Sequence, residues 1–282
     1  MNIHINSKKK FCHIGFPNNG EVSVLRGLAH LYGLEYHFVH TAEDTFRSAA
    51  HVLESSLVCI WNGKQLGSSL MSTLCESRGI PKFHLEWGML PQSHTYFVDP
   101  GGFCGDSILN YNLEWVTSED IEEYKKLQLT IQSNYSLGNE GYILIPLQRT
   151  TDSQILYYTK YNSMQEFVAE IEYMYPNNKI LIKPHPKEPQ INISTKHDIA
   201  NPKDDFLELA SKASLVVGLT STSLYEAAIL GKPVVSIGDH PLRNNLLSKR
   251  DKLLAGITVL RTKRTPDSIK SVLDRFNIEP RY

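Results

Sequence analysis

Residues 216–238 read VVGLTSTSLYEAAILGKPVVSIG, and this stretch decides the fold class of the chain. The apolar run that ends at Gly218 predicts a buried strand, residues Thr222 to Leu230 predict a helix, and residues Pro233 to Ile237 predict a second buried strand. A strand, a helix and a strand in so short a space are typical of a βαβ unit, whose two strands lie parallel in one sheet.

The same alternation continues toward both termini. Further strands are predicted at Phe11 to Gly15, Tyr36 to Val39, Leu57 to Trp61, Lys82 to Leu85, Tyr142 to Leu147 and Lys179 to Ile182, and the strand that ends at Gly218 covers Leu215 to Val217. Amphipathic stretches predict helices over residues 22–32, 42–53, 66–78, 118–132, 163–173 and 205–212. We therefore expect an α/β fold with two Rossmann-type, doubly wound domains that face a central cleft.

A linker-like stretch, SNYSLGNEG at residues 133–141, separates the two series of strands. It places the expected boundary between an N-terminal domain of residues 1–138 and a C-terminal domain of residues 139–282.

Charge and composition limit the classes of partner. Lys and Arg total 29 against 30 Asp and Glu, a net charge of -1, so no overall cationic field favours binding to nucleic acid. Residues 242–282 differ, with ten Lys or Arg against four Asp or Glu. This basic segment is either a solvated helical surface or a face for an anionic acceptor or a membrane lipid. No apolar run is long enough to span a membrane, so we expect a cytoplasmic protein, with peripheral contact at the inner membrane left open.

The segment LIKPHPKEP at residues 181–189 carries the sharpest local signal. Two prolines fix the backbone around His185 where a buried strand emerges from the sheet. A ring nitrogen of His185 could donate to a phosphate oxygen, with Lys183 or Lys187 adding positive charge nearby. The alternative is a structural histidine.

A hydroxyl cluster opens the helix of residues 222–230. Thr220, Ser221, Thr222 and Ser223 can cap this helix and, with its free N–H groups, hold a phosphate, while Glu226 could accept from ribose hydroxyls. The alternative is an ordinary capping box in which Ser223 pairs with Glu226. Together with the His185 motif, the cluster indicates a nucleotide-phosphate site.

Five segments resemble those of the capsule polysaccharide synthesis proteins, the family that includes the bacterial retaining β-Kdo glycosyltransferases. KPHP at 183–186 and STSLYEAAILGKPVVSIG at 221–238 are similar to motifs that related transferases share. ESRGIPKFHLEWGMLP at 76–91, TYFVDPGGFCGDSIL at 95–109 and ILIPLQRTTDSQI at 143–155 are similar to segments of the capsule and Kdo branch. The resemblance implies the GT-B fold and transfer of Kdo from CMP-Kdo to a saccharide or glycolipid acceptor. It also implies that the N-terminal domain lies on the acceptor side and that the C-terminal domain binds the nucleotide sugar.

The resemblance also suggests the catalytic groups. Retention by double displacement needs a carboxylate nucleophile and a group for proton transfer, and the candidates are Asp152 and Glu86. The structural alternatives are a helix cap for Asp152 and a charge partner for Glu86. Gln148 and Arg149 are expected to orient the donor carboxylate and His94 to contact the acceptor, with a surface position as the alternative for Arg149. No DxD motif is present, and no metal or cofactor is expected beyond the CMP-sugar substrate.

Two other readings of the function stay open. The same scaffold could use another donor, namely CMP-sialic acid, a CDP-polyol or a UDP-sugar. The chain could also be a non-catalytic, saccharide-binding subunit.

Overall fold

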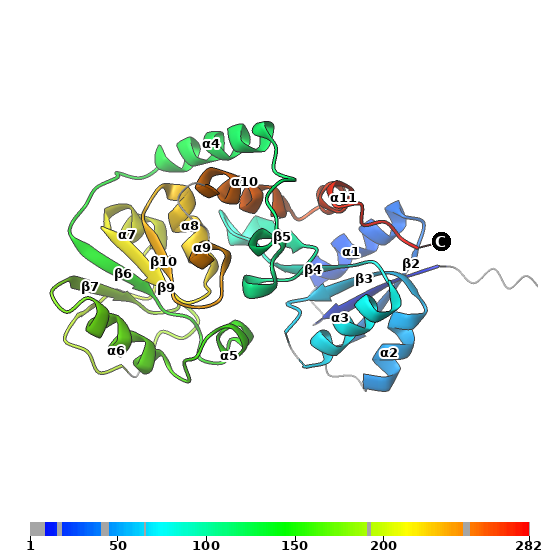
Figure 1. The fold of residues 1–282 in the computed structure, drawn as a ribbon, viewed down its shortest axis with the longest axis horizontal. Helices are drawn as coiled ribbons and strands as arrows, with labels where there is room; N and C mark the ends of the chain where they lie inside the picture. The colour runs from blue at the N-terminus through cyan, green and yellow to red at the C-terminus, as the bar shows by residue number, and fades with distance from the viewer. Residues whose placement is uncertain are drawn as a thin grey trace, which may run out of the picture. The chain divides into compact units, whose positions relative to one another are not determined.

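The fold comes from a computed structural model in which the chain divides into two compact units (Figure 1). Unit 1 comprises the residues up to Phe103 and those from Leu260 onward, and unit 2 comprises residues Cys104 to Val259. The structure describes residues 9–15, 19–40, 45–64, 66–190, 193–244 and 249–281.

Unit 2 is built on a five-stranded parallel sheet with the order β10-β9-β6-β7-β8. Its strands are β6 (Tyr142–Pro146), β7 (Lys179–Lys183), β8 (Asp198–Ile199), β9 (Leu215–Gly218) and β10 (Val234–Ser236). Every residue of the central strand β6 is buried, as expected where helices cover both faces of a parallel sheet. The four strands predicted for this half of the chain are confirmed.

Helices cover both faces of this sheet (Figure 1). The helices of unit 2 are η2 (Cys104–Asp106), η3 (Ile108–Asn110), α4 (Ser118–Gln132), α5 (Ser153–Tyr158), α6 (Met164–Met174), α7 (Phe206–Lys212), α8 (Thr222–Leu230), α9 (Pro241–Asn244) and α10 (Arg250–Leu260). Helix α6 lies on one face, and α7 and α8 lie on the other (Figure 1). The prediction of a doubly wound fold is therefore confirmed for this unit.

The structure divides the chain at a different point from the boundary expected near residue 138. The backbone N–H of Gly138 donates to the Ser211 carbonyl at 3.0 Å, and that of Glu140 donates to the Lys212 carbonyl at 2.8 Å. The linker-like stretch is thus fastened to the end of α7 inside unit 2.

Helix α4, which precedes that stretch, also packs within unit 2. The side-chain amides of Gln128 and Gln132 donate to the carbonyls of Ile229 and Leu230 at 2.8 and 2.9 Å. These carbonyls end α8, where Gly231 adopts a left-handed conformation with φ of 98°. Since α4 satisfies groups that a helix end leaves unpaired, it belongs to the same unit as α8.

Unit 1 contains a mixed six-stranded sheet with the order β11-β5-β4-β3-β1-β2. Its strands are β1 (Lys10–Gly15), β2 (Glu35–His40), β3 (Ser55–Trp61), β4 (Lys82–Trp87), β5 (Thr95–Asp99) and β11 (Arg261–Lys263). Its helices are α1 (Asn19–Leu31), α2 (Thr45–Leu53), α3 (Leu66–Arg78), η1 (Gln92–His94) and α11 (Pro266–Arg275). The four predicted strands are confirmed, and residues 42–44 of the predicted second helix lie outside the described residues. The sequence analysis missed β5, which runs antiparallel to β4.

The C-terminal residues complete unit 1. Strand β11 pairs antiparallel with β5, and Pro266 at the start of α11 meets Gly27 of α1. Near the chain end, the guanidinium of Arg281 donates to the carbonyls of Ser55 and Leu53 at 3.0 and 2.7 Å.

Two arginines of this basic segment have partners within unit 1. The guanidinium of Arg261 donates from Nε to the Met89 carbonyl at 2.7 Å. That of Arg264 lies 4.3 Å from the ring centre of Trp87 and donates to the Thr95 carbonyl at 3.2 Å. Stacking and hydrogen bonding of this kind fix a guanidinium against the protein. The positive charge that suggested a lipid-binding face is thus partly engaged in the fold.

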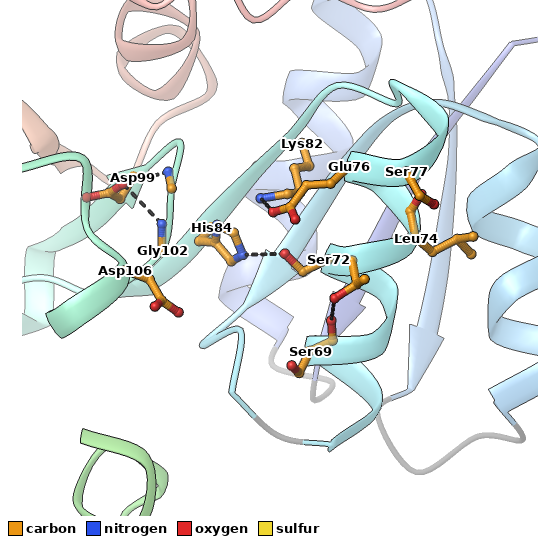
Figure 2. A network of polar contacts seen from close by, with 12 residues as sticks. Ser69, Ser72, Leu74, Glu76, Ser77, Lys82, His84, Asp99, Gly102 and Asp106 are labelled. Atoms are coloured by element: carbon orange, nitrogen blue, oxygen red, sulfur yellow. Dashed lines mark hydrogen bonds and ion pairs between the residues drawn. The ribbon is translucent and has the colours of Figure 1, made fainter. Parts of the chain in front are cut away.

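His84 is buried in unit 1 and neutral. Burial, the largest cause, and the charge of Lys82 lower the pKa of His84 to about 3. Its Nε2 lies 3.5 Å from the hydroxyl of Ser72 on α3, and Figure 2 shows this contact beside the Glu76–Lys82 ion pair.

The unfolding free energy should therefore depend on pH through His84. In the unfolded chain a histidine takes up a proton below about pH 6.5, whereas folded His84 does so only near pH 3. Stability should fall as the pH drops from 6.5 toward 4.5, by about 1.4 kcal/mol per pH unit for this residue. Urea unfolding of His84→Gln should show a slope shallower by that amount. His30→Gln, on the exposed face of α1, is the matched control. An unchanged slope in His84→Gln would contradict the prediction.

Candidate functional site

The strand order of unit 2 creates a topological switch point between β6 and β9. From β6 the chain builds outward through β7 and β8, then crosses to β9 and builds outward through β10 on the other side. The connections after β6 and β9 therefore diverge and leave a crevice at the carboxyl ends of these two strands, where open α/β sheets bind ligands. Most of the candidate residues follow β6, β7 or β9 at this edge.

A buried bridge joins the two strand ends at the switch point. The Oε1 atom of Gln148 accepts from the backbone N–H of Thr220 at 2.9 Å, and its Nε2 donates to the Thr220 hydroxyl at 3.1 Å. The two residues are only 7% and 2% exposed. The sequence analysis predicted that Gln148 contacts the donor, but the structure places both ends of its amide on Thr220. Gln148 and Thr220 thus fix the loops that carry the other candidates.

Ser221 caps helix α8. Its hydroxyl oxygen accepts from the backbone N–H of Ser223 at 3.2 Å and from the hydroxyl of Ser223 at 2.7 Å. Because Ser221 is the N-cap, the capping box considered for Ser223 and Glu226 does not form. Glu226 lies one turn into the helix and is half-buried, as is Thr222 at the first helical position. The positive end of α8 and a pair of hydroxyl groups thus open beside the switch point.

His185 presents a ring N–H at the end of β7. Its Nδ1 accepts from the backbone N–H of Lys187 at 3.1 Å, which assigns the proton of the neutral ring to Nε2. Burial first, and then the charges of Arg149 and Lys187, lower the pKa of His185, while Asp152 and Glu188 oppose that shift. The half-buried imidazole is therefore neutral near pH 7 and carries its N–H donor at Nε2.

Lys183 is buried and makes a contact within the fold. It is only 6% exposed, and its ammonium donates to the Pro202 carbonyl at 3.0 Å. Burial lowers the pKa of Lys183. Lys183 thus anchors the segment after β8, whereas the exposed Arg149 lies close enough to influence the charge of His185.

Asp152 is the N-cap of α5. Its Oδ1 accepts from the backbone N–H of Gln154 at 2.9 Å, so the helix-cap interpretation is confirmed. Within the described residues, no hydrogen bond reaches Oδ2. The carboxylate is half-buried, and its charge acts on His185. One oxygen is thus fixed by the fold, and the other is available to a ligand.

A pocket of about 200 Å³ opens beside His185. It is lined by Leu147, Gln148, Thr150, Ser163, Met164, Gln165, His185, Glu188, Gln190 and Ile193. The hydroxyl of Thr150 donates to Glu188 at 2.9 Å and so ties the loops after β6 and β7 together. The volume of this pocket lies below the range of about 300–1,000 Å³ that is usual for a drug-sized ligand, so the pocket fits one part of a larger molecule.

Unit 1 holds the other two candidates. Glu86 lies at the carboxyl end of β4, where it accepts from the side-chain amide of Asn62 at 2.6 Å and from the Trp87 N–H at 2.9 Å. The structural alternative for Glu86 was an arginine or histidine partner, and the sequence analysis missed Asn62. The Asn-Gly pair after β3 was the available signal, since Asn62 has a φ of 61°. His94 is exposed, and its Nδ1 lies 2.8 Å from the Ser93 hydroxyl.

In the part of the chain that the structure describes, the His, Cys, Asp and Glu side chains form no group of three or more that could hold a metal ion. Among the same residues, no helix is both long enough and apolar enough to cross a membrane.

Residues 121–242 match the family model described as "Capsule polysaccharide biosynthesis protein". The expected resemblance to the capsule polysaccharide synthesis family is thereby confirmed. The match spans the strands of unit 2 and the candidate residues that follow them.

Two solved structures of Kdo transferases share the fold. The chain is 16% identical to "KpsC, beta Kdo 2,7 transferase" of Thermosulfurimonas dismutans, with a TM-score of 0.65 over 96% of this chain and 99% of that one. It is 17% identical to "KpsC, beta Kdo 2,4 transferase" of the same organism, with a TM-score of 0.63 over 92% and 97%. The predicted GT-B glycosyltransferase fold is confirmed.

A curated relative is Protein FixF of Sinorhizobium fredii, strain NGR234. It is 24% identical over 201 residues, which cover 65% of this chain and 48% of the relative. The matched part of the chain thus spans about half the length of this relative.

The N-cap at Ser221 can be tested by its effect on stability. Ser221→Ala should lower the unfolding free energy by about 1 kcal/mol, because the alanine leaves the first N–H groups of α8 without a side-chain acceptor. Ser221→Asp should keep the stability, since aspartate caps as well as serine. Urea unfolding measures both, and equal stability of Ser221→Ala and the wild type would contradict the cap.

Proposed function

We propose that the chain is a retaining glycosyltransferase that moves Kdo from CMP-Kdo to a saccharide or glycolipid acceptor in the synthesis of a surface polysaccharide. One observation carries the proposal: the Nε2–H of His185 and the capped start of α8 lie on the two sides of one switch point. The family match and the Kdo transferases that share the fold support this choice of chemistry.

In this proposal the phosphate of CMP binds between these groups. The loop after β7 offers a neutral N–H donor at His185, and the loop after β9 offers hydroxyl groups at Ser221, Thr222 and Ser223. The positive end of the α8 dipole adds attraction for an anion. Since these donors are held by the fold, they need little reorganisation as charge builds on the departing phosphate. Removal of one such donor costs on the order of 3 kcal/mol in comparable oxyanion sites. In this proposal Glu226 accepts from the ribose hydroxyls.

Asp152 is the nucleophile in this proposal. Its Oδ2 attacks the anomeric carbon of Kdo, the bond from that carbon to the phosphate oxygen breaks, and CMP leaves with the electron pair. An acceptor hydroxyl then attacks the same carbon, the bond to Asp152 breaks, and the carboxylate is regenerated. Two inversions give net retention.

Glu86 is the candidate base for the second step and takes the proton of the acceptor hydroxyl. Its carboxylate is held by Asn62 and by the Trp87 N–H, so its orientation is fixed within unit 1. Arg149 is the candidate partner of the Kdo carboxylate, and exposed His94 is a candidate contact for the acceptor. In this proposal unit 2 binds the nucleotide sugar, and unit 1 contacts the acceptor.

Nucleotide binding can be measured apart from transfer. Calorimetry should show that the chain binds CMP more tightly than CDP or UDP. His185→Ala should weaken CMP binding about tenfold or more, because it removes a hydrogen bond to a charged group. Ser221→Asp should abolish binding while it preserves the helix cap, since the new carboxylate repels the phosphate. Unchanged affinity in both variants would place the nucleotide elsewhere, and a preference for CDP or UDP would favour one of the other donors.

Replacement of Asp152 tests the double displacement. Asp152→Asn should abolish transfer from CMP-Kdo, because an amide is a poor nucleophile, while CMP affinity stays within about twofold of the wild type. The asparagine also preserves the cap of α5. The matched control is Asp205→Asn, which replaces another N-cap of unit 2. Near-normal turnover in Asp152→Asn would remove Asp152 as the nucleophile. Binding of saccharide without any transfer by the wild type would favour a non-catalytic subunit.

A further inference from the structure

The short helix α5 depends on its neighbours for its position. It has six residues, fewer than an isolated helix needs to be stable in water. Only Ile155 and Tyr158 of this helix are buried, and Leu156 and Tyr157 are 67% and 52% exposed. Contacts from other parts of unit 2 must therefore hold α5 in place, and with it the N-cap Asp152.

The segment η2 supplies the main polar contacts. The hydroxyl of Tyr158, a residue that is 7% exposed, donates to Oδ2 of Asp106 at 3.0 Å. The thiol of Cys104 lies 3.5 Å from Oε1 of Gln154, in the first turn of α5. On the other side, the backbone N–H of Asp239 donates to the Tyr158 carbonyl at 2.8 Å. Both ends of α5 are thus held by segments distant in sequence.

Gly105 allows η2 to lie against α5. A Cβ atom at this position would lie 3.2 Å from the Tyr158 ring and 3.2 Å from Cβ of Asp239. Such contacts are tighter than ordinary van der Waals distances, so a larger residue would push the three segments apart. The hydroxyl of Tyr158 can reach Asp106 because Gly105 permits this approach.

We propose that Asp106, acting through Tyr158, is a positioning residue for Asp152. This inference rests on the proposed role of Asp152 as the nucleophile. The bond fixes the last residue of α5, the buried Ile155 fixes its middle, and Oδ2 of Asp152 is thereby held in one direction at the start of the helix. A displacement of about 1 Å at a reacting atom can lower a rate by about a hundredfold, so a contact six residues away can control the chemical step.

The test separates positioning from binding. Tyr158→Phe and Asp106→Ala should each lower kcat for transfer from CMP-Kdo by about ten- to a hundredfold. The KM for the donor and the CMP affinity by calorimetry should stay unchanged, because His185 and Ser221 lie on other loops. Asp106→Asn should recover most of the rate, since its amide oxygen still accepts from the Tyr158 hydroxyl.

Tyr142→Phe is the matched control. The Tyr142 hydroxyl is held as closely, donating to the Leu209 carbonyl at 2.6 Å, and the residue is 3% exposed. It is the first residue of β6, whereas Asp152 follows the carboxyl end of that strand, so the two residues lie at opposite ends of the parallel strands. This variant should lose stability without the specific loss of kcat.

Hydrogen exchange gives a readout that does not require transfer. The amides of residues 153–158 should lose protection in Tyr158→Phe and keep it in Tyr142→Phe. Unchanged protection of α5 in Tyr158→Phe would overturn the inference, whether or not the wild type transfers Kdo. Normal kcat in Tyr158→Phe, beside an active wild type, would also overturn it and would leave the proposed function standing. A wild type that binds no CMP and transfers no Kdo would instead contradict the proposed function.

Discussion

The buried bridge between Gln148 and Thr220 is the contact on which the candidate site depends. At a switch point the chain leaves the two neighbouring strands in opposite directions, so no crossover helix joins their ends. The Gln148 amide links the two strand ends with two hydrogen bonds. A buried amide or N–H without a partner would cost about 1–3 kcal/mol, so each residue requires the other. The loops to α5 and α8 therefore start from one fixed point.

The groups that flank this bridge share a second property. Each accepts a hydrogen bond from the backbone N–H two residues further along its own loop. Asp152 caps α5 through Oδ1, His185 accepts a backbone N–H through Nδ1, and Ser221 caps α8 through its hydroxyl oxygen. A side chain held in this way has lost its rotational freedom before a ligand arrives. Preorganisation of this kind is what electrostatic stabilisation of a developing charge requires. The structural and functional interpretations of these residues are thus compatible, although the sequence analysis set them against each other.

The sequence predicted the regular parts of both units because hydrophobic periodicity is a local signal. Strand β6 and helix α8 could be read from their own residues. Strand β11 could not, because Arg-Thr-Lys has no strand pattern, and only its pairing with β5 makes it a strand. The role of Gln148 was missed for a similar reason. A glutamine after a strand is usually exposed, and its burial depends on Thr220, 72 residues away in the chain.

Charge counted along a sequence overestimates the charge that a surface offers, and the C-terminal segment shows why. Its ten basic residues suggested a face for anionic lipid or acceptor. Arg261 and Arg264 instead place their guanidinium groups on backbone carbonyls and on the Trp87 ring, and Arg281 donates to the Ser55 carbonyl at the start of β3. Arginine suits this role because the N–H groups of its planar guanidinium can donate to several carbonyls while the face of the same group stacks on an aromatic ring. The attraction of a membrane acts on charge that can approach it, and these three guanidinium groups are fixed to unit 1 by contacts that such an approach would have to break.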